Sequence, residues 1–382
     1  MMSKIICKNC IYDENTPKID FNQDGICNYC TLMEQLIDHY GTGKEKGEKL
    51  FQEHIDKIKV DGRGKQYDCV VGVSGGTDSS YMIYKAVEWG LRPLAVHYDN
   101  TWNSAIATQN IRKVLNKLDI DLYTHVVNNK EMDDIYKSFF RASVPDLDSP
   151  TDIALAEVLY RAASKFGLKY ILEGHSFITE GISPLGTLYM DGKYIDSLQK
   201  KFGTVKIKTF PNMKLSSFMK WIIFKRIKKI RPFWYIEYSK SDARKFLEDN
   251  FDWEYYGGHH LENRMTAFHH SFYCFEKFNI DNRINSLSAS VRAGLLSKKD
   301  ALYEYNETKP HLEPDLLNYF KKRLKLNDRE FNRIMSLPKK SYKDYKTYKK
   351  TFEMLRPLFY VLYKFQLVPH SFYIKYTSKS EI

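Results

Sequence analysis

The sequence has no long apolar run. No stretch of its 382 residues approaches the ~18–20 consecutive apolar residues that cross a bilayer, which excludes a membrane-spanning helix. The N-terminus, Met1 to Cys7, lacks the apolar core and the small-residue cleavage pattern of a secretory signal. Internal repeats and low-complexity stretches are also missing. We therefore expect a cytoplasmic protein.

Disorder is excluded by what the chain does contain. Its composition is 43% hydrophobic, and 28 Tyr with 23 Phe supply far more buriable surface than a disordered chain carries. The length suggests two or three domains. Lys and Arg number 59 against 47 Asp and Glu, a net charge of +12. Because this charge is spread along the chain and not gathered in one RNA-binding domain, we expect no stable nucleic-acid partner.

Cysteine is scarce and unevenly placed. Four of the six cysteines lie in the first 30 residues as two Cys-x-x-Cys pairs, Cys7 with Cys10 and Cys27 with Cys30. A disulfide scaffold would spread its bridges through a small secreted domain. The two pairs predict instead a structural zinc ribbon with four thiolate ligands, and an iron–sulfur cluster or a redox dithiol are the alternatives. The isolated Cys69 and Cys274 are expected to be small buried residues.

The order of the predicted elements indicates an α/β fold. Apolar strands are predicted at 68–73, 92–98, 122–127 and 168–173, and amphipathic helices at 77–89, 104–117, 130–141 and 152–166. Apolar strands that alternate with helices are typical of a parallel sheet covered on both faces. We predict that residues 1–30 form the two cysteine knuckles of the zinc ribbon and that a helical connector follows at 31–66. An α/β domain is predicted at 67–205 and a mostly helical domain at 206–382. The basic run 220–231 is predicted to be an amphipathic helix.

The strongest catalytic signal lies between the first strand and the first helix of the α/β part. The run is Val73-Ser74-Gly75-Gly76-Thr77-Asp78-Ser79-Ser80. A strand-to-helix turn aims free backbone N–H groups and the positive end of a helix at one point, and two glycines let the backbone close around phosphate oxygens. Asp78 is suited to the first turn of the helix, or to the role of ligand for a Mg²⁺ ion bound to the phosphate.

Two other phosphate loops are excluded by their missing residues. The chain has no G-x-x-x-x-G-K-[ST] Walker loop and no G-x-G-x-x-G dinucleotide fingerprint at this place. A tight turn before a capped helix is the simpler alternative, since Ser, Gly, Thr and Asp favour such positions.

The run 74–79 resembles the SGGxDS loop of the PP-loop ATP pyrophosphatases. This resemblance implies a five-stranded adenine-nucleotide α-hydrolase fold in which ATP and Mg²⁺ bind and ATP is split into AMP and pyrophosphate. Since such sheets bind ligands at the carboxyl ends of their strands, His97 and Asp99 are expected to flank the adenine and the substrate. Gly174-His175 matches the Gly-His step that the superfamily places near the ribose and the α-phosphate.

Three features are similar to the N-acetyl sugar amidotransferases of surface-polysaccharide and pseudaminic-acid type. The first is the pair of cysteine knuckles followed by the loop. The second is the segment 180–184, followed by the residue pairs 194–195, 202–203 and 210–211, and the third is the run 256–268. These motifs occur in the same order as in that family, and the resemblance extends to about residue 305. His259 and Asn282 stand where that family has Lys, so no phosphate or substrate contact is carried over to them. The resemblance implies catalytic roles for Asp78, Ser79, His175, Glu180, His260 and Arg264, and leaves Glu262 and Arg283 as further candidates.

The implied reaction converts an acetamido group of a sugar to an acetamidino group. The acetamido oxygen attacks the α-phosphorus of ATP, and ammonia then displaces AMP from the imidate. Neither Cys69 nor Cys274 lies in a glutaminase context, so a separate glutaminase subunit is expected to supply ammonia. The alternatives are a tRNA-modifying PP-loop enzyme, of the thiolase or lysidine-ligase type, and a non-catalytic zinc-ribbon scaffold. A thiolase should carry reactive cysteines near its ATP site.

Overall fold

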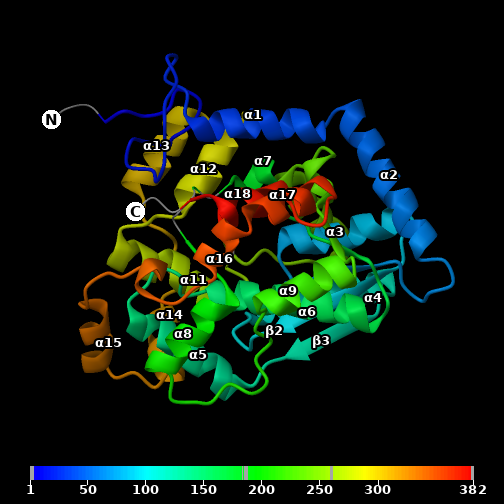
Figure 1. The fold of residues 1–382 in the computed structure, drawn as a ribbon. Coiled ribbons are helices and arrows are strands. Elements are labelled where there is room, and N and C mark those ends of the chain that lie inside the picture. The colour runs from blue at the N-terminus through cyan, green and yellow to red at the C-terminus, as the bar shows by residue number, and fades with distance from the viewer. Residues whose placement is uncertain (1–3, 183, 185–187, 259–260, 380–382) are drawn as a thin grey trace.

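A five-stranded sheet forms the centre of the α/β part of the molecule (Figure 1). The computed structural model describes residues 4–182, 184, 188–258 and 261–379. Neighbouring strands pair in parallel in the order β3-β2-β1-β4-β5. The strands are β1 (Cys69–Gly72), β2 (Pro93–Asp99), β3 (Leu122–Val126), β4 (Tyr170–Leu172) and β5 (Lys228–Ile230). The predicted α/β fold with a parallel five-stranded sheet is confirmed.

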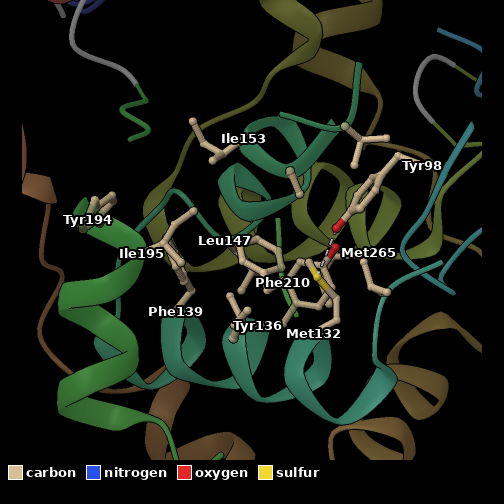
Figure 2. Packing of buried hydrophobic residues seen from close by; sticks show 14 of the residues in the cluster. Tyr98, Met132, Tyr136, Phe139, Leu147, Ile153, Tyr194, Ile195, Phe210 and Met265 are labelled. Atoms are coloured by element: carbon tan, nitrogen blue, oxygen red, sulfur yellow. Dashed lines mark hydrogen bonds between the residues drawn. The ribbon is translucent and has the colours of Figure 1, made fainter. Parts of the chain in front are cut away.

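Successive residues of β1 enter two different apolar cores, as the two-residue period of a strand requires. Val70 belongs to the core under α5 (Asn129–Ala142), α6 (Ser149–Lys165) and α8 (Gly192–Phe202). Cys69 and Val71 belong to the core under α2 (Glu45–Asp61), α3 (Thr77–Glu88), α4 (Ala105–Leu118) and α10 (Lys240–Phe251). Figure 2 shows the first core, where Phe139 of α5 packs beside Tyr194 of α8, with 5.3 Å between the ring centroids. The sheet is therefore buried on both faces.

The fifth strand comes from the basic run 220–231, and the prediction of an amphipathic helix there is wrong. The run forms a π-helical turn, η1 (Lys220–Phe224), followed by β5. Lys229 and Arg231 lie two residues apart, so both reach Glu173 just beyond β4, and Arg231 Nε is 3.1 Å from its carboxylate. Pairing with β4 and with this partly buried carboxylate outweighs the local helical pattern.

The remaining elements are helical. The cysteine knuckles lead into α1 (Asn28–Tyr40), which Figure 1 shows along the outside of the molecule before α2. Among the described residues, no helix combines the length and the apolar character that crossing a bilayer requires. The other helices are α7 (Phe177–Glu180), α9 (Leu215–Met219), η2 (Pro232–Trp234), α11 (Arg264–Phe268), η3 (His269–Phe278), α12 (Arg283–Arg292), α13 (Lys298–Glu307), α14 (Leu316–Arg323), α15 (Asp328–Met335), η4 (Tyr342–Asp344), α16 (Lys349–Met354), α17 (Arg356–Lys364) and α18 (His370–Thr377).

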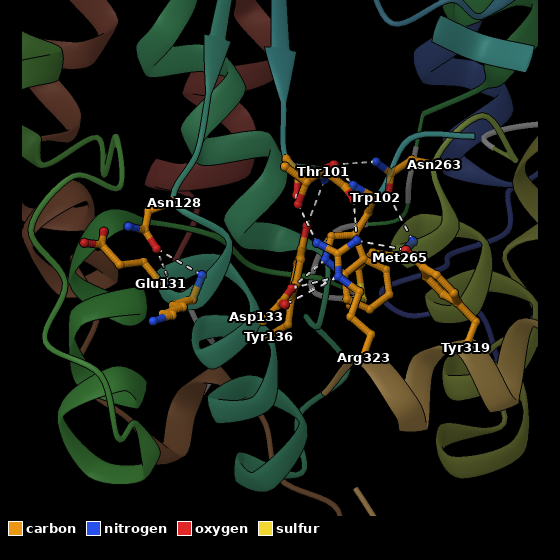
Figure 3. A network of polar contacts seen from close by, with 12 residues as sticks. Thr101, Trp102, Asn128, Glu131, Asp133, Tyr136, Asn263, Met265, Tyr319 and Arg323 are labelled. Carbon is orange, nitrogen blue, oxygen red and sulfur yellow. Dashed lines mark hydrogen bonds and ion pairs between the residues drawn. The ribbon is translucent and has the colours of Figure 1, made fainter. Parts of the chain in front are cut away.

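One arginine of the C-terminal helices holds the segment that follows β2 (Figure 3). The Arg323 guanidinium lies 4.2 Å from the ring centroid of Trp102 and pairs with Asp133, with Nε 3.2 Å from Oδ1. It also donates to the carbonyl and the hydroxyl of Thr101. Thr101 has φ +65°, a left-handed conformation that costs a β-branched residue free energy. These contacts therefore fix the backbone at the carboxyl end of β2.

We expect Arg323→Met to lower the free energy of unfolding by about 2–4 kcal/mol, because Asp133 is left without its cation and Thr101 loses two donors. Urea denaturation followed by circular dichroism measures the loss. The matched control on the same helix is Lys321→Met. Lys321 pairs with Asp328, whose side chain is 80% exposed. Because solvent screens this ion pair, we expect the control to lose less than about 0.5 kcal/mol of unfolding free energy. Equal losses for the two variants would contradict this account of the network.

Candidate functional site

The loop at 74–76 is held by contacts on its far side. Gly75 has φ +83°, and a Cβ there would lie 2.2 Å from the carbonyl oxygen of Ala107 in α4. The Gly75 carbonyl accepts hydrogen bonds from Trp253 Nε1 at 3.2 Å and from Asn110 Nδ2 at 3.4 Å. Only glycine fits this position, and the two donors keep the carbonyl turned toward α4.

Serine hydroxyls bind the two ends of the loop together. Ser74 Oγ and Ser79 Oγ are 3.1 Å apart, and the Gly76 amide donates to Ser74 Oγ at 3.3 Å. The loop leads directly into the first turn of α3 at Thr77. The backbone N–H groups of a first helical turn have no partner within their helix and carry the positive end of its dipole. This end of α3 is therefore suited to a phosphate group.

A cavity of about 150 Å³ opens at this helix end. It lies at the carboxyl ends of β1 and β4, where sheets of this kind bind ligands. Its walls come from the loop, the segment after β4, α7, the start of α10, Tyr256 and Glu262. The lining residues are Ser74, Gly76, Asp78, Ser79, Gly174, His175, Glu180, Lys240, Tyr256 and Glu262. Six of these ten were predicted from the phosphate loop and the strand end, and Glu180 and Glu262 were candidates from the family resemblance.

Asp78 faces two partners that the sequence did not indicate. Its carboxylate is 2.6 Å from Lys240 Nζ and also accepts from the Tyr238 hydroxyl. Burial alone lowers the pKa of Lys240, but Asp78 and Glu180 raise that pKa above its ordinary value. Lys240 is thus an ammonium ion in the cavity wall. No local motif marks it, since it lies 162 positions from Asp78.

His175 is held in one tautomer. The indole N–H of Trp234 donates to its Nδ1 at 3.1 Å, and an indole nitrogen can only donate. The neutral ring therefore carries its proton on Nε2, which is 3.8 Å from the Glu180 carboxylate. Burial lowers the pKa of His175 below 6.5, although Glu180 acts in the opposite direction. The ring is neutral near neutral pH and presents an N–H beside a carboxylate.

His97 supports the start of the loop from behind, and Asp99 holds the segment after β2. His97 Nδ1 is 2.8 Å from the carbonyl oxygen of Val73, and Asn103 Nδ2 donates to His97 Nε2 at 3.2 Å. Asp99 accepts from the amide of Thr101 at 2.7 Å. Both side chains bind backbone or amide groups of the strand ends, so they shape the site and do not line the cavity.

Gly174 allows the strand end to approach α3 closely. A Cβ at this position would lie 2.5 Å from the carbonyl oxygen of Asp78. Packing therefore requires glycine at the position before His175, because a side chain there would push α3 away from β4.

Tyr256 and Glu262 line the cavity beside the loop. A Cβ on Gly76 would lie 3.0 Å from the Tyr256 hydroxyl and 3.2 Å from Glu262 Oε1. Arg264 lies apart from this wall, with its guanidinium 4.7 Å from the Tyr319 ring centroid and 3.8 Å from Glu313 Oε1. His260, also expected at the site, is outside the described residues.

The four cysteine sulfurs lie close together. All four Sγ atoms fall within 4.8 Å of one another, with Cys7 to Cys30 at 3.7 Å and Cys10 to Cys27 at 3.8 Å. A tetrahedral ion with Zn–S bonds of ~2.3 Å has sulfur–sulfur edges of ~3.8 Å. The cluster could therefore hold a single tetrahedral metal ion.

The knuckles also contact the helix pair next to the cavity. The Tyr12 hydroxyl donates to Asn285 Oδ1 of α12 at 2.8 Å and to the carbonyl of Ile182 at 3.4 Å. Gly181, which follows Glu180, has φ +76°, and a Cβ there would lie 2.9 Å from the Asn285 carbonyl oxygen. The cysteine knuckles therefore support the turn that carries Glu180.

We expect Gly75→Ala to abolish nucleotide binding, because its Cβ would push the loop away from α4. Gly167 is the matched control, since it has φ +67° but a Cβ at that position would have no other atom within 4 Å. Both alanines cost about 1 kcal/mol of backbone strain. Titration with a fluorescent ATP analogue measures the affinity of each variant. Gly167→Ala should bind as the wild type does, and retained affinity in Gly75→Ala would contradict the role of the contact between Gly75 and α4.

We expect one zinc ion per chain by inductively coupled plasma mass spectrometry and no visible absorption band from iron. Cys10→Ser should lose the metal and lower the melting temperature, because tetrathiolate zinc contributes directly to folding. Cys69→Ser tests whether the loss is specific, since Cys69 lies in β1 and its replacement should leave the metal content unchanged. Stoichiometric iron and sulfide in the purified protein would contradict zinc.

Comparison with known proteins gives one family match. The model described as "LPS biosynthesis protein WbpG-like, C-terminal domain" matches residues 262–358, a region that begins at the cavity residue Glu262. No curated protein matches the chain.

Solved structures with a distant likeness include three enzymes. The U34-tRNA thiolase NcsA from Methanococcus maripaludis, with its 4Fe–4S cluster, has a TM-score of 0.31 and 13% identity, covering 89% of this chain and 98% of that one. The NH3-dependent NAD synthetase from Campylobacter jejuni has a TM-score of 0.29 and 11% identity, covering 77% and 98%. The NMN synthetase from Francisella tularensis has a TM-score of 0.27 and 15% identity, covering 58% and 92%.

Proposed function

We propose that this protein is an ATP-dependent amidotransferase of surface-glycan biosynthesis that acts in the cytoplasm. It converts the acetamido group of a sugar to an acetamidino group and releases AMP and pyrophosphate. The observation that carries this proposal is the composition of the cavity. The loop at 74–79 lines the cavity together with Glu262, the first residue of the WbpG-like region.

The loop and Lys240 bind the pyrophosphate half of ATP. The α3 N-terminus and the hydroxyls of Ser74 and Ser79 supply donors, while the Lys240 ammonium supplies a positive charge. Glu262 would hold the Mg²⁺ that accompanies ATP, since carboxylates suit this cation. The ion neutralises part of the triphosphate charge when bound.

Two displacements complete the reaction. The acetamido oxygen attacks the α-phosphorus, so that a P–O bond forms and pyrophosphate leaves. Ammonia then attacks the imidate carbon, and AMP leaves with the former acetamido oxygen. The Nε2–H of His175 donates to the α-phosphate as charge develops, and Glu180 accepts a proton from the attacking ammonia. Holding the reactants in line is the main contribution of the protein.

Ammonia comes from a separate glutaminase subunit. A glutaminase nucleophile must form a thiolate. Cys69 and Cys274 are both completely buried, and burial raises the pKa of each thiol well above its ordinary value. The other four cysteines lie together in the cluster that could hold a metal ion. The burial of Cys69 and Cys274 also argues against a tRNA thiolase, the principal alternative. A buried sulfur cannot reach the tRNA base that would accept it.

Pyrophosphate release separates the candidate functions. With ATP and an ammonium salt, we expect N-acetylated sugars to stimulate pyrophosphate release and unmodified tRNA to have no effect. The sugar product should show the mass change of replacing oxygen by NH. Stimulation by tRNA alone would favour the tRNA-modifying alternative, and ATP binding without any turnover would favour a scaffold. Use of glutamine by the purified chain would exclude the separate glutaminase.

The pH dependence tests the tautomer of His175. Because burial lowers its pKa below 6.5, we expect turnover to be constant near neutral pH and to fall only in acid, where the ring gains a second proton. Glu180 raises this pKa, so Glu180→Gln should move the acid limb to lower pH while it reduces kcat. The pH profile of kcat/KM measures the shift, and an acid limb that stays in place or moves upward would contradict this assignment.

A further inference from the structure

Two helices that are distant in the sequence flank the cysteine cluster. Figure 1 shows the knuckles beside α12 and α13, and both helices lie inside the WbpG-like region 262–358. Ile11 of the knuckles shares a small apolar core with Leu287 of α12 and Ala301 of α13. The surroundings of the four sulfurs are therefore not formed by the knuckles alone.

One arginine of α12 reaches a cysteine sulfur. Arg292 Nη1 donates to Cys30 Sγ at 3.6 Å. The half-buried guanidinium also lies 5.3 Å from the ring centroid of Tyr12, and the Tyr12 hydroxyl is bonded to Asn285 of the same helix. The Tyr12 ring therefore helps to hold the guanidinium beside the sulfur.

Further donors surround Cys7 on the other side of the cluster. The backbone amides of Asn9 and Cys27 donate to Cys7 Sγ at 3.4 and 3.2 Å. Lys298 Nζ of α13 donates to the Cys7 carbonyl oxygen at 2.7 Å. Four thiolates around a divalent ion leave excess negative charge on the site. The WbpG-like region places two cations, Arg292 and Lys298, beside that charge.

We propose that Arg292 is an outer-sphere partner of the metal ion held by the four cysteines, so that the WbpG-like region completes the metal site. A charge-assisted hydrogen bond to a thiolate stabilises its negative charge. Outer-sphere partners of metal ligands typically change metal affinity by roughly 10- to 100-fold. Packing on the Tyr12 ring alone would not require a donor directed at the Cys30 sulfur.

The zinc affinity of the full chain tests the proposal. Competition with a chromophoric chelator under reducing conditions measures the dissociation constant. Arg292→Met keeps an apolar stem but removes the donor and the charge, and we expect it to weaken zinc binding by roughly tenfold or more. Arg292→Lys keeps the charge and should lose less. The matched control is Lys299→Met in α13, an exposed cation whose loss should leave the affinity unchanged, because solvent and salt screen its charge.

Substitution with Co²⁺ separates a hydrogen bond to sulfur from a structural role. In the cobalt form, the thiolate-to-metal charge-transfer band reports the energy of the sulfur electrons, and the d–d bands report the tetrahedral geometry. A hydrogen bond to Cys30 lowers the energy of those electrons. Arg292→Met should therefore shift the charge-transfer band to longer wavelength and leave the d–d bands in place. A loss of packing alone would change the d–d bands as well.

Four results would overturn the proposal. They are a wild-type chain that binds no zinc, equal zinc affinity of Arg292→Met and the wild type, an equal loss in Lys299→Met, and a cobalt charge-transfer band that does not move. Circular dichroism of each variant establishes that lost affinity is not lost folding. The inference does not rest on the proposed reaction, and the assays contain neither ATP nor sugar, so a failure here leaves that reaction standing.

Discussion

The close approach of the Gly75 backbone to helix α4 is the constraint on which the site depends. A side chain at this position would meet the Ala107 carbonyl at 2.2 Å, and the Gly75 carbonyl is held by Trp253 and Asn110. With that carbonyl fixed on the far side, the first turn of α3 stays open toward the cavity. The geometry of the loop and of the first turn of α3 is therefore built by packing, which would reduce the ordering that the binding of a phosphate requires.

The electrostatics of the cavity follow from residues brought together by the fold. Lys240 balances Asp78, while Glu180 faces the neutral ring of His175. Behind them, Lys229 and Arg231 outweigh the effect of burial and lower the pKa of Glu173 to about 2. The segment after β4 thus has its charges fixed near neutral pH. Fixed charges around a triphosphate stabilise developing negative charge without reorganisation during the reaction.

Local sequence patterns make much of the fold and part of the candidate site predictable. The first four strands, the loop and the cysteine pairs each carry their signal within a few residues, through apolar runs, glycines or ligand spacing. Lys240, Tyr238 and Trp253 reach the loop through contacts more than 150 positions away in the chain, and no short pattern encodes such contacts. The prediction for the run containing β5 is wrong for the same reason, because its partners, β4 and Glu173, are distant in sequence.

The fate of one oxygen atom tests the proposed reaction most directly. If the acetamido oxygen attacks the α-phosphorus of ATP, an N-acetylated sugar labelled with ¹⁸O in its acetyl carbonyl must transfer that label to AMP. The measurement is mass spectrometry of the nucleotide and the sugar after turnover with ammonium. This account predicts AMP that carries the label and an acetamidino sugar without it. ADP as the nucleotide product, or unlabelled AMP beside an amidine product, would contradict it.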